Sequence, residues 1–417
     1  MLRKPSAPAS LRILTLGMAC LALGCTSSPF ESADLEEEED RPSAVENLRG
    51  DPADLAQDGF AQAVEPRDFV FPADHGPHPD FQTEWWYLTG RVETAEGRVF
   101  GFQWTLFRHA LVSQAPARSS SWGVRDAYMA HFAVSDVENG RQYSFERQSR
   151  GSGGLAGAQA TPFRAWLEDW ELRSEAESNA AVADGTLDDT GGEDPSDALF
   201  FPLRLKSADG NTDGGGTAVD LRITTRKPKV LQGERGLSRK NGLPGGASYY
   251  YSYTRLAVEG QVEVDGESFD VKGEAWLDRE WSTSVLAPDQ AGWDWFSLQL
   301  DSGEDLMLYH LRLEDGSADA FSAGVWVEAD GGYTYLSRDT FEIEILDRWK
   351  SPRTGSVYPS DWILTLPDRD LRLAVTPLFA DQELAVGFQY WEGAVAVEGT
   401  REGRPITGGG YVELVGY

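Results

Sequence analysis

Large apolar residues alternate with polar ones along many short segments of this chain. In one such segment, every second position is held by Phe100, Phe102, Trp104, Leu106 and Arg108. Because side chains of a β-strand point alternately to its two faces, these side chains are expected to share one face of a strand. No long segment keeps the period of an amphipathic helix. The pattern therefore predicts an all-β protein.

Further strands are predicted in two series, with Gly, Pro and Asp between them at spacings of roughly 8–12 residues. The first series includes residues 219–225, 248–258, 261–264 and 268–277. The second series includes residues 293–300, 305–312, 321–328, 333–336, 341–346, 362–366, 371–375, 385–390, 394–399 and 411–417. A turn at 302–303 is expected to join the first two strands of this series as a hairpin. Many short strands at this spacing are typical of barrels and sandwiches.

The two series begin in a similar way. A Trp-Tyr pair at 86–87 precedes residues 102–108, and a Trp-Phe pair at 295–296 precedes residues 306–312. In each case an aromatic strand turns through a glycine and a second strand ends at an arginine. This weak repeat favours two duplicated barrels over one large sandwich. We expect their interiors to leave an apolar hollow for a ligand.

The boundary between the two barrels is predicted near residues 285–291. Pro288 and Gly292 interrupt the strands there. We therefore expect an N-terminal domain at 69–285 and a C-terminal domain at 286–417.

The first 68 residues have a different composition. Residues 1–25 have a basic start and a short apolar run that ends at Cys25. The run is too short to span a bilayer and resembles a bacterial lipoprotein signal. We predict a lipid on Cys25 and a location in the bacterial cell envelope, with cleavage of an ordinary signal peptide as the alternative. Residues 26–68 are acidic and poor in large apolar residues, which predicts a disordered tether.

Charge and cysteine content restrict the possible partners. The net charge of −31 argues against nucleic acid and anionic lipid, because both are recognised by basic surfaces. Membrane attachment is therefore expected only through the N-terminal lipid. Both cysteines belong to the signal segment, which leaves no thiol for a disulfide or a zinc site. His75 and His78 flank a Gly-Pro turn without a third ligand, so we predict no metal. The sequence also has no phosphate loop or dinucleotide fingerprint, so we predict no cofactor.

A set of short motifs extends from about residue 70 to the C-terminus. They are Phe71-Pro-Ala-Asp-His-Gly-Pro-His78, Glu84-Trp-Trp-Tyr-Leu-Thr-Gly90, Phe107-Arg108, Val230-Leu-Gln-Gly233, Tyr249-Tyr-Tyr-Ser252, Trp276-Leu-Asp-Arg-Glu-Trp-Ser282, Gly292-Trp-Asp-Trp-Phe296, Tyr390-Trp-Glu-Gly393 and Gly410-Tyr-Val-Glu-Leu-Val-Gly-Tyr417. Together these motifs resemble the AttH/CrtC family, which includes bacterial AttH proteins and carotenoid 1,2-hydratases. The resemblance implies two lipocalin-like antiparallel β-barrels packed together. It is closer to the AttH branch, often described as predicted secreted hydrolases, and more distant from fungal cyclases of the Diels–Alder type.

The strongest catalytic candidates are Asp278 and Glu280. On a strand they point to the same face as Trp276, about 6.5–7 Å apart, while Arg279 and Trp281 point to the other. On an enclosed apolar face, burial and mutual repulsion would keep one carboxyl protonated near neutrality. Such an acid can protonate an alkene, and indole faces can stabilise the resulting cation. The alternative is that both carboxylates form structural hydrogen bonds between the barrels.

Two further clusters combine charge with tryptophan. Glu84 and Trp86 share a strand face, and an ion pair of Glu84 with Arg108 would close the floor of the first barrel, as a structural role. In the second barrel, Asp294 and His310 are the catalytic candidates and Arg312 lies on the same paired strand. The predicted ligand-binding residues are Glu84, Trp85, Trp86, Trp104, Arg108, Trp276, Trp281, Trp293, Trp295, Arg312 and Trp391.

The sequence is compatible with several functions. The first is an envelope lipoprotein that binds a hydrophobic small molecule such as a terpenoid, polyketide or lipid. The second is a cofactor-free, acid-catalysed hydratase, isomerase or cyclase acting on such a molecule. A secreted hydrolase and a non-catalytic structural envelope protein are the alternatives. The chain has no Gly-x-Ser-x-Gly nucleophile motif, which weakens the hydrolase hypothesis.

Overall fold

The computed structural model describes residues 59–114, 125–176, 196–210, 215–283 and 286–417. The predicted signal peptide, Cys25 and most of the predicted tether lie outside these residues. Within them, strands dominate, and α3 (Asp197–Phe200) is the single α-helix. None of the described helices is long and apolar enough to cross a membrane. Short 3-10 turns occur at η1 (Ala73–His75), η2 (Ser152–Gly154), η3 (Arg338–Thr340) and η4 (Pro367–Arg369).

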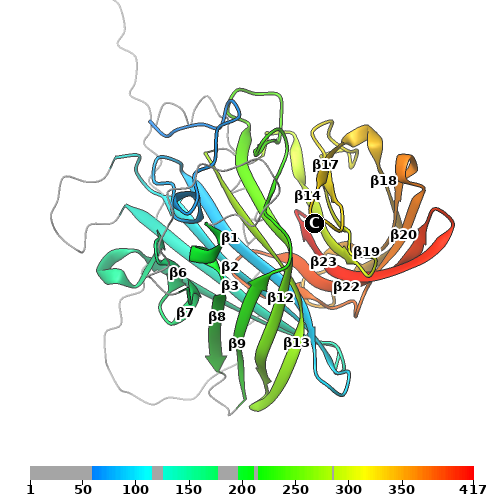
Figure 1. The fold of residues 1–417 in the computed structure, drawn as a ribbon, viewed down its shortest axis with the longest axis horizontal. Coiled ribbons are helices and arrows are strands. Elements are labelled where there is room, and N and C mark those ends of the chain that lie inside the picture. The colour runs from blue at the N-terminus through cyan, green and yellow to red at the C-terminus, as the bar shows by residue number, and fades with distance from the viewer. Residues whose placement is uncertain (1–58, 115–124, 177–195, 211–214, 284–285) are drawn as a thin grey trace, which may run out of the picture. The chain divides into compact units, whose positions relative to one another are not determined.

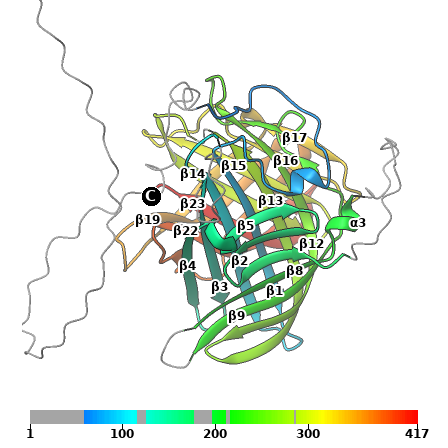
Figure 2. The same ribbon diagram turned by 90° about the vertical axis from the view of Figure 1, so that its left-hand side faces the viewer.

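The strands form two antiparallel sheets that share no strand (Figures 1 and 2). The first sheet has the order β4 (Arg141–Arg150), β3 (Asp126–Asp136), β2 (Val99–Ala110), β1 (Thr83–Glu93), β13 (Glu267–Ser282), β12 (Ala247–Val264), β9 (Gly216–Thr225), β8 (Leu203–Gly210), β7 (Trp170–Ser174), β6 (Phe163–Leu167) and β5 (Ala156–Ala160). Two short strands also pair with β12, namely β10 (Val230–Leu231) and β11 (Leu237–Arg239).

The second sheet follows the first in the chain. Its order is β17 (Tyr333–Ser337), β16 (Ala323–Val327), β15 (Asp305–Leu313), β14 (Gln290–Leu300), β23 (Arg404–Val415), β22 (Tyr390–Arg401), β20 (Leu371–Pro377), β19 (Val357–Leu366) and β18 (Glu342–Lys350). The short strand β21 (Glu383–Leu384) pairs with β22. The predicted hairpin through residues 302–303 is confirmed, since β14 and β15 pair across it.

Each sheet curls around its own apolar core. In the first sheet, alternate residues such as Leu88, Trp104 and Leu277 fill the inner face. In the second, Phe296 and Trp362 do the same. The first sheet is thereby a near-barrel and the second a half-barrel, so the predicted all-β fold of two barrel-like antiparallel sheets is confirmed.

A third apolar cluster lies between the sheets. It is built from the opposite faces of the same strands, including Tyr87 on β1, Tyr250 on β12 and Trp295 on β14. Both faces of these strands are therefore buried, and the two sheets belong to one compact unit. Burial of both faces explains why the strands nearest the junction read as nearly continuous apolar runs.

Some predicted boundaries are wrong. Residues 248–258 and 261–264 form one strand, β12, and the predicted strand at 385–390 is not one, because β21 ends at Leu384 and β22 begins at Tyr390. The predicted strand at 411–417 begins earlier, because β23 starts at Arg404 and its Gly408 to Gly410 pair with β14. A side chain at Gly410 would collide with the carbonyl of Ser297, so glycine is required there by close backbone approach.

The predicted tether is too long at its C-terminal end. Ala63 is buried, and the carbonyl of Glu65 accepts a hydrogen bond of 2.9 Å from the Tyr249 hydroxyl. Thr283 also donates to the carbonyl of Ala61. Residues 60–68 therefore pack on the first sheet, because their backbone groups find partners there.

Candidate functional site

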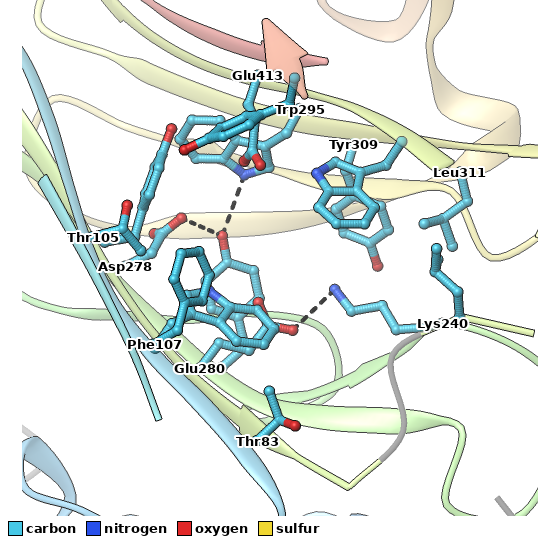
Figure 3. Close-up of a pocket in the computed structure, with 16 residues that line it drawn as sticks. Thr83, Thr105, Phe107, Lys240, Asp278, Glu280, Trp295, Tyr309, Leu311 and Glu413 are labelled. Carbon is cyan, nitrogen blue, oxygen red and sulfur yellow. Dashed lines mark hydrogen bonds and ion pairs between the residues drawn. The ribbon is translucent and has the colours of Figure 1, made fainter. Parts of the chain in front are cut away.

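A cavity opens between the two sheets rather than inside either of them (Figure 3). Its free space is about 870 Å³, counting the open mouth. Aromatic and aliphatic side chains make up most of the wall, and a few polar groups are set among them. The lining residues are Thr83, Trp85, Tyr87, Thr105, Phe107, Lys240, Tyr250, Asp278, Glu280, Leu286, Trp293, Trp295, Tyr309, Leu311, Tyr390 and Glu413. Such an apolar pocket with convergent polar groups is typical of a small-molecule site.

Strand alternation on β13 aims two carboxyls at this cavity. Asp278 and Glu280 both line it, whereas Leu277 and Trp281 face the core of the first sheet. The predicted division of this segment between two faces is therefore confirmed. Each of the two carboxyl residues is at most 5% exposed, so water stabilises their charge poorly.

Asp278 accepts hydrogen bonds from three neutral groups. The hydroxyl of Tyr250 donates to Oδ2 at 2.6 Å, that of Ser252 donates to Oδ1 at 2.5 Å, and the indole of Trp276 donates to Oδ1 at 2.6 Å. Burial raises the pKa of Asp278 to about 7, with a further contribution from the charge of Glu280, although the three hydrogen bonds act in the other direction. Near neutral pH this carboxyl is therefore divided between its acid and its base form.

Tyr250 connects the acid to the other sheet. Its hydroxyl, which donates to Asp278, also accepts a hydrogen bond of 3.3 Å from the indole of Trp295 on β14. Trp276 and Trp295 meet edge to face, with ring centroids 6.1 Å apart. The acid is thus held by side chains from both walls, which restricts its orientation.

Lys240 is the only cationic side chain among the described residues of the lining. Its ammonium lies 3.3 Å from the carboxylate of Glu280, which also accepts a hydrogen bond from Ser248. The same ammonium lies 4.4 Å from the ring centroid of Tyr309. Burial acts to lower the pKa of Lys240, but Glu280, Tyr309 and Asp278 together outweigh it and the pKa is raised. Lys240 is therefore a bound ammonium and not a free amine nucleophile.

A third carboxyl enters from the second sheet. Glu413 on β23 lines the cavity and lies directly across the strand pair from Glu392 on β22, which is fully buried. Burial raises the pKa of Glu413 to about 8, helped by the charges of Asp278 and Glu280. Burial and Glu413 together raise the pKa of Glu392 well above its usual range. This pair therefore holds protons at neutral pH.

Five of the predicted site residues line this cavity. They are Trp85, Trp293, Trp295, Asp278 and Glu280. Trp276 does not line it but donates to Asp278. The cavity thus combines candidates that the sequence had placed in separate barrels.

A second group of predicted residues lies inside the first sheet. The carboxylate of Glu84, which is fully buried, pairs with both Arg108 and Arg279, so the predicted ion pair of Glu84 with Arg108 is confirmed. The guanidinium of Arg279 lies 3.9 Å from the ring centroid of Trp86. Burial acts to raise the pKa of Glu84, but Arg279, His78 and Arg108 lower it far below its usual range. Trp281 and Trp104 pack in this same core, and Trp391 packs in the core of the second sheet.

The remaining candidates, Asp294, His310 and Arg312, lie near the C-terminal residues of the chain, and two of them form hydrogen bonds with those residues. Asp294 is fully buried and accepts hydrogen bonds from Arg312 at 3.0 Å and from the hydroxyl of Tyr417 at 2.7 Å. His310 lies 4.0 Å from the same carboxylate. None of Asp294, His310 and Arg312 lines the cavity.

Several residues of the site were missed by sequence reasoning. Lys240, Tyr250, Tyr309 and Tyr390 come from four distant segments of the chain. Of these, Tyr250 and Tyr390 belong to motifs of the family resemblance, but neither motif indicated that its tyrosine faces a cavity. Within the described residues, no three His, Cys, Asp or Glu side chains are arranged to hold a metal ion.

Comparison with known proteins identifies the family. The AttH-like family model matches residues 62–417. A crystal structure assigned to AttH (NE1406) from Nitrosomonas europaea is 34% identical with a TM-score of 0.70, and the match covers 86% of this chain and 100% of that chain. Kievitone hydratase from Nectria haematococca is 15% identical with a TM-score of 0.59, covering 86% of this chain and 96% of that chain, which shows a shared fold. Curated proteins give no match. This chain therefore belongs to the AttH-like family.

Proposed function

We propose that this protein binds a hydrophobic small molecule in the cavity between its sheets and moves a proton on that molecule without a cofactor. The products would be those of a hydratase, isomerase or cyclase. The observation that carries the proposal is Asp278, a carboxyl with a pKa of about 7 on the wall of an apolar cavity. A carboxylic acid that keeps its proton near neutral pH can act as a general acid.

The proposed reaction begins with proton transfer from Asp278 to the bound molecule. The proton of Asp278 passes to a carbon of an alkene and leaves a carbocation and the Asp278 carboxylate. The indole faces of Trp85, Trp293 and Trp295 line the same cavity and stabilise that cation. The cation then adds water and gives the surplus proton back to the Asp278 carboxylate, or it loses a neighbouring proton to that carboxylate. Alternatively, a second alkene of the same molecule attacks it, and the new cation loses a proton to the same carboxylate. These three outcomes correspond to hydration, isomerisation and cyclisation.

The comparisons with known proteins support the proposed class of reaction, but they do not identify the substrate. A protein with this fold is a hydratase, so hydration is one established use of the scaffold. At 15% identity its substrate says nothing of the one used here.

The cellular setting is also a proposal. We propose that the mature protein is attached to the bacterial envelope by a lipid on Cys25 and that residues 26–58 provide reach from the membrane. Mass spectrometry of the mature N-terminus tests this directly. A chain that begins at Cys25 and carries acyl groups supports the proposal, and an unmodified N-terminus contradicts it.

The decisive experiment begins with the natively purified protein. Lipid-soluble material extracted from it is identified by mass spectrometry and then incubated with fresh protein in D2O. We expect wild type to convert this molecule with incorporation of deuterium, and Asp278→Asn to retain it without conversion. Asp315→Asn, which changes an exposed carboxyl, is the matched control and should behave as wild type.

Binding without turnover is the second candidate. It is favoured by the three hydrogen bonds that Asp278 accepts, since a fully bonded carboxylate can be structural. A ligand that wild type retains but returns unlabelled from D2O would establish this candidate and end the catalytic one. For hydrolysis, the described lining offers no Ser, Cys or His.

A further inference from the structure

Tyr390 lines the cavity from the second sheet, and its hydroxyl is tied to groups outside the cavity. The Tyr390 hydroxyl lies 2.7 Å from Nδ1 of His131 on β3. Nε2 of the same ring lies 3.2 Å from a carboxylate oxygen of Glu146 on β4. The three groups form a chain that runs from the cavity wall toward the surface, and the proposed chemistry on Asp278 does not use it.

The direction of these hydrogen bonds follows from the charges. The hydrogen bond from His131 lowers the pKa of Glu146. The backbone N–H of Gly387, which donates to a carboxylate oxygen of Glu146 at 2.8 Å, lowers it further. Glu146 is therefore a carboxylate and can only accept. Nε2 of His131 must then carry the hydrogen that it donates to Glu146.

The other ring nitrogen is left as an acceptor. His131 is fully buried, and burial lowers its pKa even though Glu146 acts in the other direction. A neutral imidazole with hydrogen on Nε2 has a lone pair on Nδ1. The hydroxyl proton of Tyr390 therefore points at His131. The oxygen of Tyr390 has two lone pairs, of which protonated Glu392 can engage one, and the other is left for a cavity ligand.

The charges of the lining disfavour a negatively charged ligand. The lining has three carboxyl groups, Asp278, Glu280 and Glu413, and one ammonium, which Glu280 already engages. Glu392 and Glu413 both face Tyr390 closely enough to influence it. A ligand carboxylate would add a further negative charge to a cavity with few compensating cations.

We propose that the cavity selects a neutral hydrophobic molecule with a hydroxyl group, an alcohol or a phenol, that donates its hydrogen bond to Tyr390, and that it rejects carboxylates. The aromatic walls accommodate the body of such a ligand. His131 and Glu146 act as positioning residues, because they fix the orientation of the Tyr390 hydroxyl. This inference rests on the binding part of the proposed function and is independent of turnover.

Three naphthalene derivatives that differ only in one substituent test whether the cavity selects a hydroxyl group. They are 2-naphthol, 2-methoxynaphthalene and 2-naphthoate, which present a donor, no donor and a carboxylate, and their binding to the full protein is measured by titration calorimetry at neutral pH. We expect 2-naphthol to bind about fivefold to tenfold more tightly than 2-methoxynaphthalene, the effect of one neutral hydrogen bond. We expect 2-naphthoate to bind about a hundredfold more weakly than 2-naphthol.

Three variants assign these preferences to residues. Tyr390→Phe should abolish the advantage of 2-naphthol over 2-methoxynaphthalene. Tyr143→Phe removes a hydroxyl outside the lining, which donates to Asp265 at 2.7 Å, and should leave that advantage unchanged. Glu280→Gln frees the ammonium of Lys240 and should strengthen the binding of 2-naphthoate.

The outcomes separate this inference from the proposed function. Equal binding of 2-naphthol and 2-methoxynaphthalene by wild type, or tightest binding of 2-naphthoate, overturns the selection even if the natural ligand is still converted. An equal loss in the two tyrosine variants overturns the role of Tyr390. If none of the three probes binds, the cavity is not a small-molecule site and both proposals fail.

Discussion

Two buried carboxyl clusters lie on opposite faces of the same two strands, β1 and β13. On the inner face, Glu84 is held by Arg108 and Arg279. On the outer face, Asp278 and Glu280 look into the cavity between the sheets. Residues 278, 279 and 280 are consecutive, so strand alternation alone sends their charges to different environments.

The clusters differ in their balance of charge. Glu84 has two guanidinium partners, and its pKa is strongly lowered despite complete burial. Asp278 has only neutral donors and the charge of Glu280 nearby, and its pKa is raised to about 7. Burial is similar in the two places, so the partners decide the protonation state. A buried acid among tryptophans is structural when arginines neutralise it and is available for proton transfer when they are absent.

The largest expected effect comes from removing the paired carboxylate. Glu84→Gln leaves the guanidinium groups of Arg108 and Arg279 buried without their anion, and we expect a loss of about 3–5 kcal/mol in the free energy of unfolding. Asp278→Asn leaves no uncompensated charge and should keep or gain stability at neutral pH. Urea denaturation followed by tryptophan fluorescence measures both. Similar losses in the two variants would erase the distinction between the clusters.

The pH dependence of stability sharpens the same comparison. Asp278 has a pKa of about 7 in the folded state and about 3.9 when unfolded. The folded protein therefore binds the proton more tightly, so the stability from this group is complete below pH about 4 and falls by about 1.4 kcal/mol per pH unit up to pH about 7. Asp278→Asn should remove this slope, and its advantage over wild type should grow by up to about 4 kcal/mol. Urea midpoints at several pH values test this, and parallel curves for the two proteins would contradict it.

The smallest effect concerns the hydrogen bonds of the acid. The Tyr250 hydroxyl donates to Asp278 and acts to lower its pKa. Tyr250→Phe should therefore raise the pKa of Asp278 by about one unit, as measured by 13C NMR of protein labelled in aspartate. Tyr309→Phe is the matched control, because no hydrogen bond joins Tyr309 to Asp278. A pKa that falls or stays constant in Tyr250→Phe would mean that the hydroxyl does not stabilise the carboxylate.

Local patterns predicted the strands and the partition of side chains between their faces. Alternation was sufficient to place Asp278 and Glu280 together and to oppose them to Arg279, as the structure has it. The pairing of Glu84 with Arg108 followed from the same reasoning, since the two residues lie directly across β1 and β2. These features depend only on residues close in sequence or on neighbouring strands.

The position of the cavity could not be derived in this way. β1, β13 and β14 are apolar on both faces, so the sequence does not say which face forms a barrel core and which packs on the other sheet. Trp86 and Trp85 therefore looked alike, although Trp86 belongs to the core of the first sheet and Trp85 to the cavity. Lys240 and Tyr390 reach the cavity only through packing between the sheets, which has no local sequence signal.

The pKa of Asp278 is the most direct test of this account. It is measured by 13C NMR titration of aspartate-labelled wild-type protein, with the resonance assigned by its absence from Asp278→Asn. We expect a value of about 7, which makes this carboxyl a proton donor in neutral solution. A value near roughly 4, that of an ordinary aspartate, would show that the cavity holds a permanent carboxylate and would contradict the proposed acid catalysis.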